Sequence, residues 1–169
     1  MTEAAERGKI VAEARKWIGT PYHNCADVLG VGVDCGMLIV RCFVDSSLCA
    51  PFDPRPYPPD WHLHRGEERY LGFVFDRCAE TDAPEPGDVI VFRYGRCYSH
   101  GGIVTRREPL TFVHAFWPAR AVVEEELDRN VQLCMPARAR RFFSYWKKTA
   151  LFKTSDISDV SRSSEAVGA

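Results

Sequence analysis

The sequence lacks any apolar run long enough to span a bilayer, and we expect no secretory leader. Its first seven residues, MTEAAER, include two glutamates, and no apolar stretch follows a basic start, which argues against a Sec-type signal peptide. There is no C-x-x-C spacing, and the seven cysteines are an odd number that cannot all pair within one chain. We therefore expect synthesis in a reducing cytoplasm, with free thiols and without membrane insertion.

An excess of positive charge is also missing. The 22 lysines and arginines are balanced by 23 aspartates and glutamates, for a formal net charge of -1. This balance argues against a nucleic-acid partner, which normally requires a basic face. His23, Cys25, His62 and His64 do not have the spacing of a metal site. We expect neither a metal nor a cofactor.

The 169 residues, 46% of them hydrophobic, are enough to build one domain with its own core. We expect this domain to occupy residues 1–150. Prolines crowd the segment 51–66, which predicts a long surface loop inserted into the domain. Residues 151–169 are rich in serine and small residues with almost no aromatic content, so a disordered tail is expected there.

Apolar periodicity predicts two helices in the N-terminal part of the chain. The first covers Thr2–Ile18 and is stopped by Gly19. The second covers Cys35–Val44 and is apolar on almost every side, which is typical of a central helix of the core. Asp34 stands at the N-cap of this second helix, where its side chain can accept from free backbone N–H groups.

The second half of the chain contains short β-type runs separated by turn signals. Their regular spacing and short connections predict an antiparallel meander. Helices followed by a meander make an α+β domain. The predicted strands are Asp88–Phe92, Gly101–Thr105, Thr111–His114, Ala121–Glu125 and, with a weaker pattern, Arg140–Tyr145.

Cys35 is a candidate nucleophile because it opens the second predicted helix. Unpaired N–H groups and the positive end of the helix dipole favour a thiolate at that position. The charge of Asp34 opposes this effect, unless capping absorbs it. A free cysteine is more commonly a small buried apolar residue, and its position alone does not separate the two interpretations.

Two histidines favour the catalytic interpretation. His100 opens one predicted strand and His114 closes the next, and the turn between them is centred near Arg107. Folding the hairpin there predicts that the two histidines lie opposite each other on one face, with Cβ atoms roughly 5 Å apart. One imidazole can then take the thiol proton while the other holds the first in the required tautomer. Either histidine could instead be a satisfied core residue.

Five blocks of sequence resemble the NlpC/P60 family of cell-wall cysteine peptidases, in the family's order and over roughly residues 10–145. The blocks are Gly19-Thr20-Pro21-Tyr22, Gly32-Val33-Asp34-Cys35, Pro86-Gly87-Asp88-Val89-Ile90-Val91-Phe92, His100-Gly101-Gly102-Ile103-Val104 and Val113-His114-Ala115. The resemblance implies a papain-like α+β fold, with the nucleophile at the start of a helix packed on an antiparallel sheet. Residues 1–150 would then be the catalytic domain.

The resemblance also implies roles for individual residues. Cys35 would attack an amide carbonyl, His100 would act as the base, and His114 would orient that base. Tyr22 matches a tyrosine beside the thiol that helps to bind the oxyanion or the substrate. The sequence departs from the family where Gly36 and Met37 follow the nucleophile in place of a small hydroxyl residue and a glycine. The residues that we expect to contact substrate are Asp34, Ser99, Gly101 and Trp61.

Family members mostly cleave the stem peptides of peptidoglycan, so the resemblance implies that substrate class. Small members without a signal peptide are typical of phage tails and gene transfer agents. We therefore expect a tail-borne enzyme that acts in the periplasm or cell wall, with tail hub or baseplate proteins as partners.

Two other interpretations stay open. The same fold and thiol could serve an acyltransferase or amidase acting on a lipid or small molecule, which a broad apolar channel beside Cys35 would favour. The chain could also be a non-enzymatic tail assembly module. A buried thiol, or histidines that point away from it, would favour that second possibility. The presence of Cys35, His100, His114 and Tyr22 together argues against it, since a site without activity has no physical need for all four.

Overall fold

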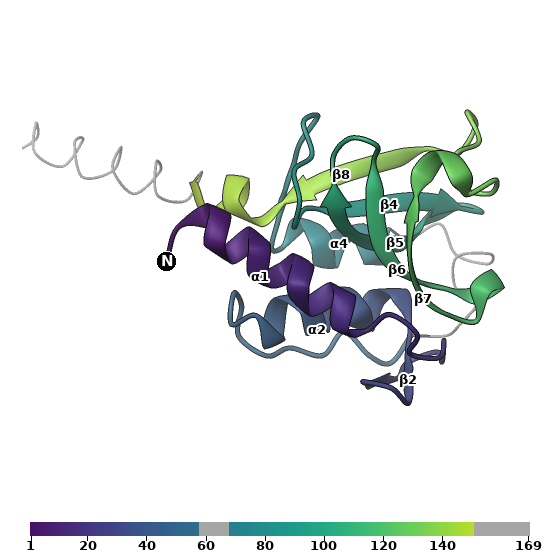
Figure 1. Ribbon diagram of the computed structural model, residues 1–169, viewed down its shortest axis with the longest axis horizontal. Coiled ribbons are helices and arrows are strands. Elements are labelled where there is room, and N and C mark those ends of the chain that lie inside the picture. Colours follow the sequence, from purple (N-terminus) through teal and green to yellow (C-terminus); the bar gives the residue numbers. More distant parts are fainter. Residues whose placement is uncertain (58–67, 151–169) are drawn as a thin grey trace, which may run out of the picture.

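A six-stranded antiparallel sheet with helices packed on one face makes up most of the computed structural model, which describes residues 1–57 and 68–150 (Figure 1). The architecture is α+β, as the sequence predicts. Trp61, most of the predicted proline-rich loop and the whole of the predicted tail lie outside the described residues. No helix in the described part of the chain is long and apolar enough to cross a membrane.

Both predicted helices are present. Helix α1 spans Glu3–Lys16, with Thr2 as its N-cap, and helix α2 spans Cys35–Asp45. Gly19 follows α1 with a φ of 87°, a conformation that glycine adopts without strain and that turns the chain away from the helix. The predicted end at Ile18 was two residues too late, because the final turn of the helix is already irregular.

The remaining elements are short. A small hairpin of β1 (Asp27–Val28) and β2 (Gly32–Val33) precedes α2, and helix α4 (Arg69–Phe75) leads into β3 (Ala79–Glu80). The main strands are β4 (Val89–Tyr94), β5 (Cys97–Arg106), β6 (Thr111–Phe116), β7 (Ala121–Glu126) and β8 (Arg140–Ser144). Two 3-10 turns flank β7, at Trp117–Ala119 and Leu127–Arg129.

The strand order is β3-β8-β4-β5-β6-β7. Strands β4 to β7 form the predicted meander, in which each strand pairs with the next one along the chain. The position of β8 in the sequence suggested that it would continue the meander beside β7, but it does not. It pairs instead with the free side of β4, and β7 remains an edge strand.

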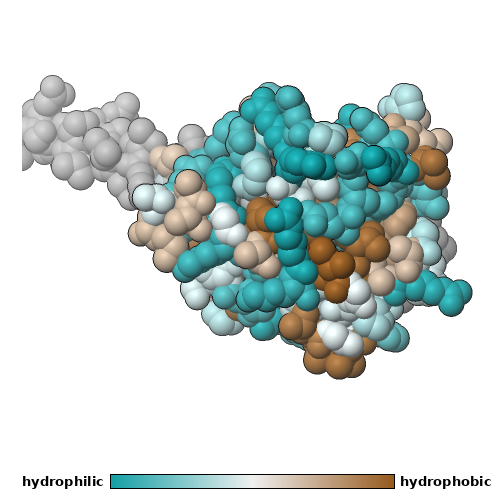
Figure 2. Space-filling view, viewed as in Figure 1, coloured by the Kyte–Doolittle hydropathy of each residue, from teal (hydrophilic) through white to brown (hydrophobic). Residues whose placement is uncertain are grey.

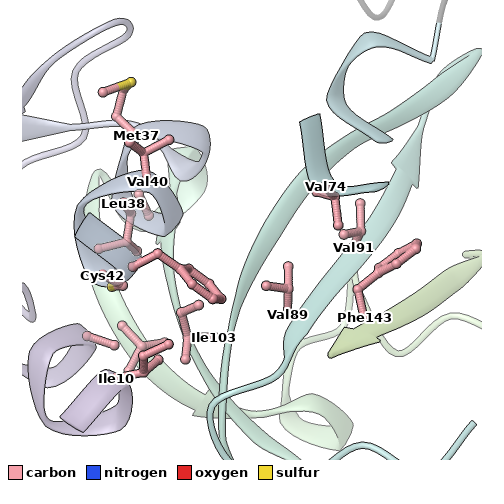
Figure 3. Close-up of a cluster of buried hydrophobic side chains, with 14 of the residues drawn as sticks. Ile10, Met37, Leu38, Val40, Cys42, Val74, Val89, Val91, Ile103 and Phe143 are labelled. Carbon is pink, nitrogen blue, oxygen red and sulfur yellow. The ribbon is translucent and has the colours of Figure 1, made fainter. Parts of the chain in front are cut away.

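The core lies between the helices and one face of the sheet (Figure 3). Alternate residues of β4 point to opposite faces of the sheet. Val89 and Val91 pack against the helices, while Ile90 and Phe92 point to the other side. On the helix face, Leu38 of α2 and Ile103 of β5 are fully buried. A second, smaller cluster covers the other face and includes aromatic side chains of β4 and β6.

The molecular surface is largely polar, with apolar patches (Figure 2). One brown patch lies at the bottom of the view, where Figure 1 places the β1–β2 hairpin. Val28, Leu29 and Val31 of that hairpin are each at least half exposed. Because all seven cysteines have free thiols, no disulfide constrains this surface or the core.

Candidate active site

Cys35 is the first residue of α2, and Asp34 caps the helix as the sequence predicts. One carboxylate oxygen of Asp34 accepts the backbone N–H of Met37 at 2.8 Å. The other oxygen accepts the backbone N–H of Cys25 at 2.6 Å, and the hydroxyl of Tyr57 donates to both oxygens at 2.9 and 3.0 Å. Asp34 therefore fixes the start of α2, and with it the position of Cys35. A contact between Asp34 and substrate stays a prediction.

The Cys35 thiol is neutral in this environment. Burial raises its pKa to about 12, and the charge of Asp34 adds to the increase. The backbone N–H of Gly101 and the hydroxyl of Tyr70 act in the opposite direction. The thiol donates to the carbonyl oxygen of Ser99 at 3.7 Å, a sulfur hydrogen bond that holds it beside strand β5. A neutral thiol needs a base before it can attack a carbonyl.

His100 and His114 form a hydrogen bond between His100 Nε2 and His114 Nδ1 of 2.8 Å. His114 is fully buried and His100 is 9% exposed. Burial lowers the pKa of both rings, and for His100 the neighbouring His114 and Arg138 lower it further. Both imidazoles are therefore neutral at neutral pH, and a neutral imidazole can accept a thiol proton.

The two histidines share one face of the sheet, as predicted, but they are not directly opposite each other. The register Ile103↔Val113 and Val104↔Phe112 puts His114 two residues away from the position facing His100. The turn occupies residues 107–110, later than predicted, and a register irregularity follows Val104. A shift of two residues preserves the face, because side chains alternate with a period of two. The hydrogen bond between the rings is diagonal.

The chain of hydrogen bonds continues beyond His114. Its Nε2 lies 2.7 Å from Oε1 of Glu125 on β7, and the side-chain amide of Asn130 donates to the same oxygen at 2.6 Å. We call His100, His114, Glu125 and Asn130 the relay. The hydrogen bond with His114 holds the pKa of Glu125 below its usual value, so this carboxyl is ionised. Neither Glu125 nor Asn130 was among the site residues predicted from the sequence.

Tyr22, the predicted oxyanion residue, lines the same cavity as Cys35. Its ring meets the ring of Trp117 edge to face, with centroids 5.5 Å apart. Burial, followed by the neighbouring Cys35 and Asp34, raises the pKa of the phenol, so the hydroxyl keeps its proton and can donate a hydrogen bond. That is the state required of an oxyanion donor.

At Gly101, strand β5 lies directly beside side chains of both α2 and α4. A Cβ atom at this position would be 2.6 Å from the hydroxyl oxygen of Tyr70 and 2.9 Å from the carbonyl oxygen of Ile90. The Tyr70 hydroxyl is 3.5 Å from the carbonyl oxygen of Cys35. Gly101 thus makes room for a tyrosine that packs against the predicted nucleophile. Whether Gly101 or Ser99 contacts substrate stays a prediction.

A cavity of about 550 Å³ opens beside Cys35, a size typical of small-ligand sites. Its lining residues form two groups. The first group comprises Tyr22, Asn24, Ser99, His100, Trp117 and Gln132. The second group is apolar and comes mainly from α2 and α4, and it comprises Ile39, Val40, Phe43, Phe52, Phe73, Val74 and Val89. We call the part of the cavity lined by this second group the apolar channel. Arg69 and Arg77 also line the cavity.

Three solved structures have the same fold. The NlpC/p60 domain of the peptidoglycan hydrolase SagA aligns with a TM-score of 0.54 and 18% identity, over 80% of this chain and 96% of that domain. NlpC1 and NlpC2 of Trichomonas vaginalis align with TM-scores of 0.58 and 0.60 and 14% identity, over 83% and 86% of this chain. This chain spans only 44% and 49% of those two proteins. No protein-family model matches the sequence, and no curated protein matches it either.

These similarities establish the fold of NlpC/p60 domains for this chain, in agreement with the fold expected from the sequence resemblance. At such low identities they do not extend to the activity. A function has to be inferred from the side chains that the fold brings together around Cys35.

Proposed function

We propose that this chain is a cysteine amidase or peptidase that hydrolyses amide bonds in peptidoglycan stem peptides. One observation carries the proposal: Cys35, at the start of α2, shares a cavity with His100, whose ring is hydrogen-bonded to His114. The thiol and a neutral imidazole are the two groups that nucleophilic catalysis requires. The substrate class draws support from the fold, which SagA, a peptidoglycan hydrolase, shares.

The proposed reaction starts with proton transfer from the Cys35 thiol to His100. The sulfur then attacks the amide carbonyl carbon, and the carbonyl oxygen becomes an oxyanion. The tetrahedral intermediate collapses, the C–N bond breaks, and the amine leaves with the proton that the imidazolium returns. Water, deprotonated by His100, hydrolyses the thioester that remains and releases the acid together with free Cys35.

Oxyanion stabilisation is assigned in this proposal to the backbone N–H of Cys35 and the hydroxyl of Tyr22. A residue at the first position of a helix has a backbone N–H that no helical carbonyl accepts. The Tyr22 phenol is protonated and lines the cavity. Removing one oxyanion donor generally costs roughly 100-fold or more in kcat.

The first test is digestion of purified peptidoglycan by the wild-type protein and by the Cys35→Ala variant, with mass spectrometry of the released fragments. We expect soluble stem-peptide fragments from the wild type and none from the variant, because the thioester cannot form without the sulfur. Cys49→Ala is the matched control, since Cys49 is also a free, partly buried thiol but does not line the cavity. Equal release by wild type and Cys35→Ala would refute a role for this thiol.

The expected setting, a phage tail or gene transfer agent with hub or baseplate partners, belongs to the same proposal. It rests on the resemblance of the five sequence blocks to the NlpC/P60 family, whose small members are typical of such particles. Purified particles probed with an antibody against this protein provide the test. If the particles lack the protein while the free protein is an active peptidase, the proposed reaction stands and the proposed role in a tail is wrong.

A second candidate function is favoured by the apolar channel. The channel follows α2 from Cys35 to Phe43, and eight residues of helix extend about 12 Å. An apolar passage of this length, leading away from the thiol, suits an acyl chain whose carbonyl carbon is at Cys35. The alternative reaction is therefore thiol-dependent acyl transfer or amide hydrolysis on a lipid or other small apolar substrate.

A chain-length series of acyl p-nitrophenyl esters tests this second candidate. If the channel holds an acyl chain, turnover rises from acetyl to octanoyl, and intact-protein mass spectrometry finds the acyl group on Cys35. If turnover is greatest for the acetyl ester and stem peptides are cleaved, the channel does not select the substrate. The Cys35→Ala variant separates enzymatic turnover from background hydrolysis in either case.

A further inference from the structure

The relay connects the base of the proposed reaction to a carboxylate that the expected Cys-His-His triad does not include. Glu125 lies on β7, two strands from His100, and its side chain is 28% exposed whereas His114 is fully buried. Strand β7 contributes Val123 and Glu125 to the face of the sheet that carries both histidines, while the neighbouring Glu124 points to the helix side and pairs with Arg15 of α1.

Hydrogen-bond directions along the relay can be assigned from one end to the other. Asn130 can offer only its amide protons to Glu125, and ionised Glu125 can only accept. His114 must therefore carry its proton on Nε2, which leaves Nδ1 of the neutral ring as an acceptor. His100 must then donate from Nε2 to His114 Nδ1. In neutral His100 the other nitrogen, Nδ1, consequently has no proton.

The orientation of Asn130 is itself fixed. Its side-chain oxygen accepts the backbone N–H groups of Gln132 and Leu133, both at 3.0 Å. The amide nitrogen is therefore the atom that faces Glu125. The oxygen and nitrogen of the Asn130 amide therefore cannot exchange positions without the loss of three hydrogen bonds.

We propose that Glu125 is a positioning residue for this site: it fixes the tautomers of His114 and His100 so that Nδ1 of His100 can take the Cys35 proton, and its negative charge stabilises the imidazolium that results. The inference rests on the proposed function, because it assigns His100 as the base. Glu125 acts through His114 and touches neither the thiol nor the substrate.

The charges around His100 explain why a carboxylate is needed. Burial disfavours a positively charged His100 most strongly, and His114 and Arg138, which is stacked on the Tyr94 ring at 4.0 Å, add to the effect. At the start of α2, Cys35 and its N-cap Asp34 line the same cavity as His100, and the Asp34 carboxylate is held by its own three donors. Strands β6 and β7 contribute His114 and Glu125. Glu125 is the carboxylate hydrogen-bonded to His114, and through His114 its negative charge offsets the effect of Arg138 when His100 takes up a proton.

The Glu125→Gln variant separates charge from shape. A glutamine can keep its carbonyl oxygen between Asn130 and His114 Nε2, so the tautomers persist while the negative charge is lost. The readout is the rate of Cys35 alkylation by iodoacetamide as a function of pH, measured by mass spectrometry of the Cys35 peptide. We expect the profile to move up by roughly one pH unit, with an alkylation rate about tenfold lower at neutral pH.

Glu124→Gln is the matched control, because it removes the same charge from the adjacent position on the other face of β7. Its alkylation profile should coincide with that of the wild type. Glu125→Asp should shift the profile less than Glu125→Gln does, because it keeps the negative charge. Coincident profiles for Glu125→Gln, Glu124→Gln and the wild type would overturn the proposal.

A measurement on the unmodified protein covers the case in which Glu125→Gln does not fold. Nitrogen-15 NMR of histidine-labelled wild type distinguishes protonated from unprotonated ring nitrogens, and we expect His100 Nδ1 to be unprotonated. A protonated Nδ1 would contradict the proposal. Alkylation and NMR need no substrate, so a failure to cleave peptidoglycan would reject the proposed function and leave this result intact.

Discussion

Asp34 has two opposing effects on its neighbour, Cys35. As the N-cap it orders the first turn of α2 and so fixes the position of the thiol. As a charge it raises the pKa of that thiol, which reduces the thiolate available for attack. The helix terminus by itself would favour the thiolate. The protein therefore keeps a precise position for the sulfur and leaves its deprotonation to a base.

Replacement of Asp34 by Asn separates these effects. The amide can still accept from Met37, but its nitrogen cannot accept from the Cys25 N–H, so we expect a loss of about 1–3 kcal/mol in unfolding free energy. Cys35 loses a negative neighbour, its pKa falls, and alkylation should accelerate roughly threefold to tenfold. Thermal denaturation and alkylation kinetics give the two values. Asp27→Asn is the control, and slower alkylation of Asp34→Asn would mean that the position of the sulfur dominates its reactivity.

Site residues that lie next to a recognisable helix cap or turn could be predicted from the sequence. Cys35 follows an N-cap signal, and the two histidines flank a recognisable turn. Glu125 was hidden within three consecutive glutamates, and only the β6–β7 register decides which of them faces His114. The pairing His114↔Val123 puts Glu125 on the same face, so a correctly placed turn would have identified it. Tyr70 follows the proline-rich segment and has no spacing that links it to Cys35.

At the scale of elements, the contact of β5 with α2 and α4 determines how closely the helices approach the sheet. Gly101 allows that approach, because the Tyr70 hydroxyl and the Ile39 side chain occupy the space where a Cβ atom would be. Tyr70 in turn packs against Cys35. The absence of one methyl group on β5 thus sets the geometry at the start of α2.

Two glycine substitutions should have opposite effects on stability. Gly101→Ala should lower the unfolding free energy by about 1–3 kcal/mol, because the methyl group collides with the Ile90 carbonyl and displaces Tyr70. Gly72→Ala should raise it by up to about 1 kcal/mol, since Gly72 is an exposed position within α4 with no atom close to the added methyl. Urea denaturation measures both. An unchanged midpoint for Gly101→Ala would contradict the close approach described here.

Element positions were easier to predict than element order. Periodicity and turn residues located both long helices and the five main strands to within a few residues. The pairing of β8 with β4 could not be predicted in this way, because alternation along a strand says which face is buried and not which neighbour it has. Helix α4 was not predicted either. It has seven residues with a glycine in the middle, too short for a helical period to be recognised.

At the scale of the whole molecule, Arg7 joins the first helix to the start of β4 and the end of β8, which lie side by side at one end of the sheet. It donates to Asp88 Oδ1 and to the Pro86 carbonyl, each at 2.9 Å, and to the Ser144 hydroxyl at 3.2 Å. Its guanidinium also lies 4.0 Å from the centroid of the Trp146 ring. Asp88 is almost fully buried, so Arg7 is the cation that makes its burial tolerable.

Arg7→Ala should therefore destabilise the fold far more than a second arginine change on the same helix. We expect a loss of about 3–5 kcal/mol, because a buried carboxylate loses its partner. Arg15→Ala should cost less than about 1 kcal/mol, since the Arg15–Glu124 pair is half exposed on the arginine side. Equal losses in urea denaturation would show that Asp88 finds another partner.

The residues of the relay come from one stretch of the chain, namely successive strands of the meander and the turn after them. Cys35 comes from a helix much earlier in the sequence, and 64 positions separate it from Ser99, which precedes His100. Hairpin contacts between neighbouring strands close short loops, and docking of the helix closes a long one. During synthesis the thiol emerges first and has no base until the meander has been made and has folded against it. A nascent or partly unfolded chain therefore has an ordinary exposed thiol without the relay, and the proposed amide hydrolysis at Cys35 requires the completed fold.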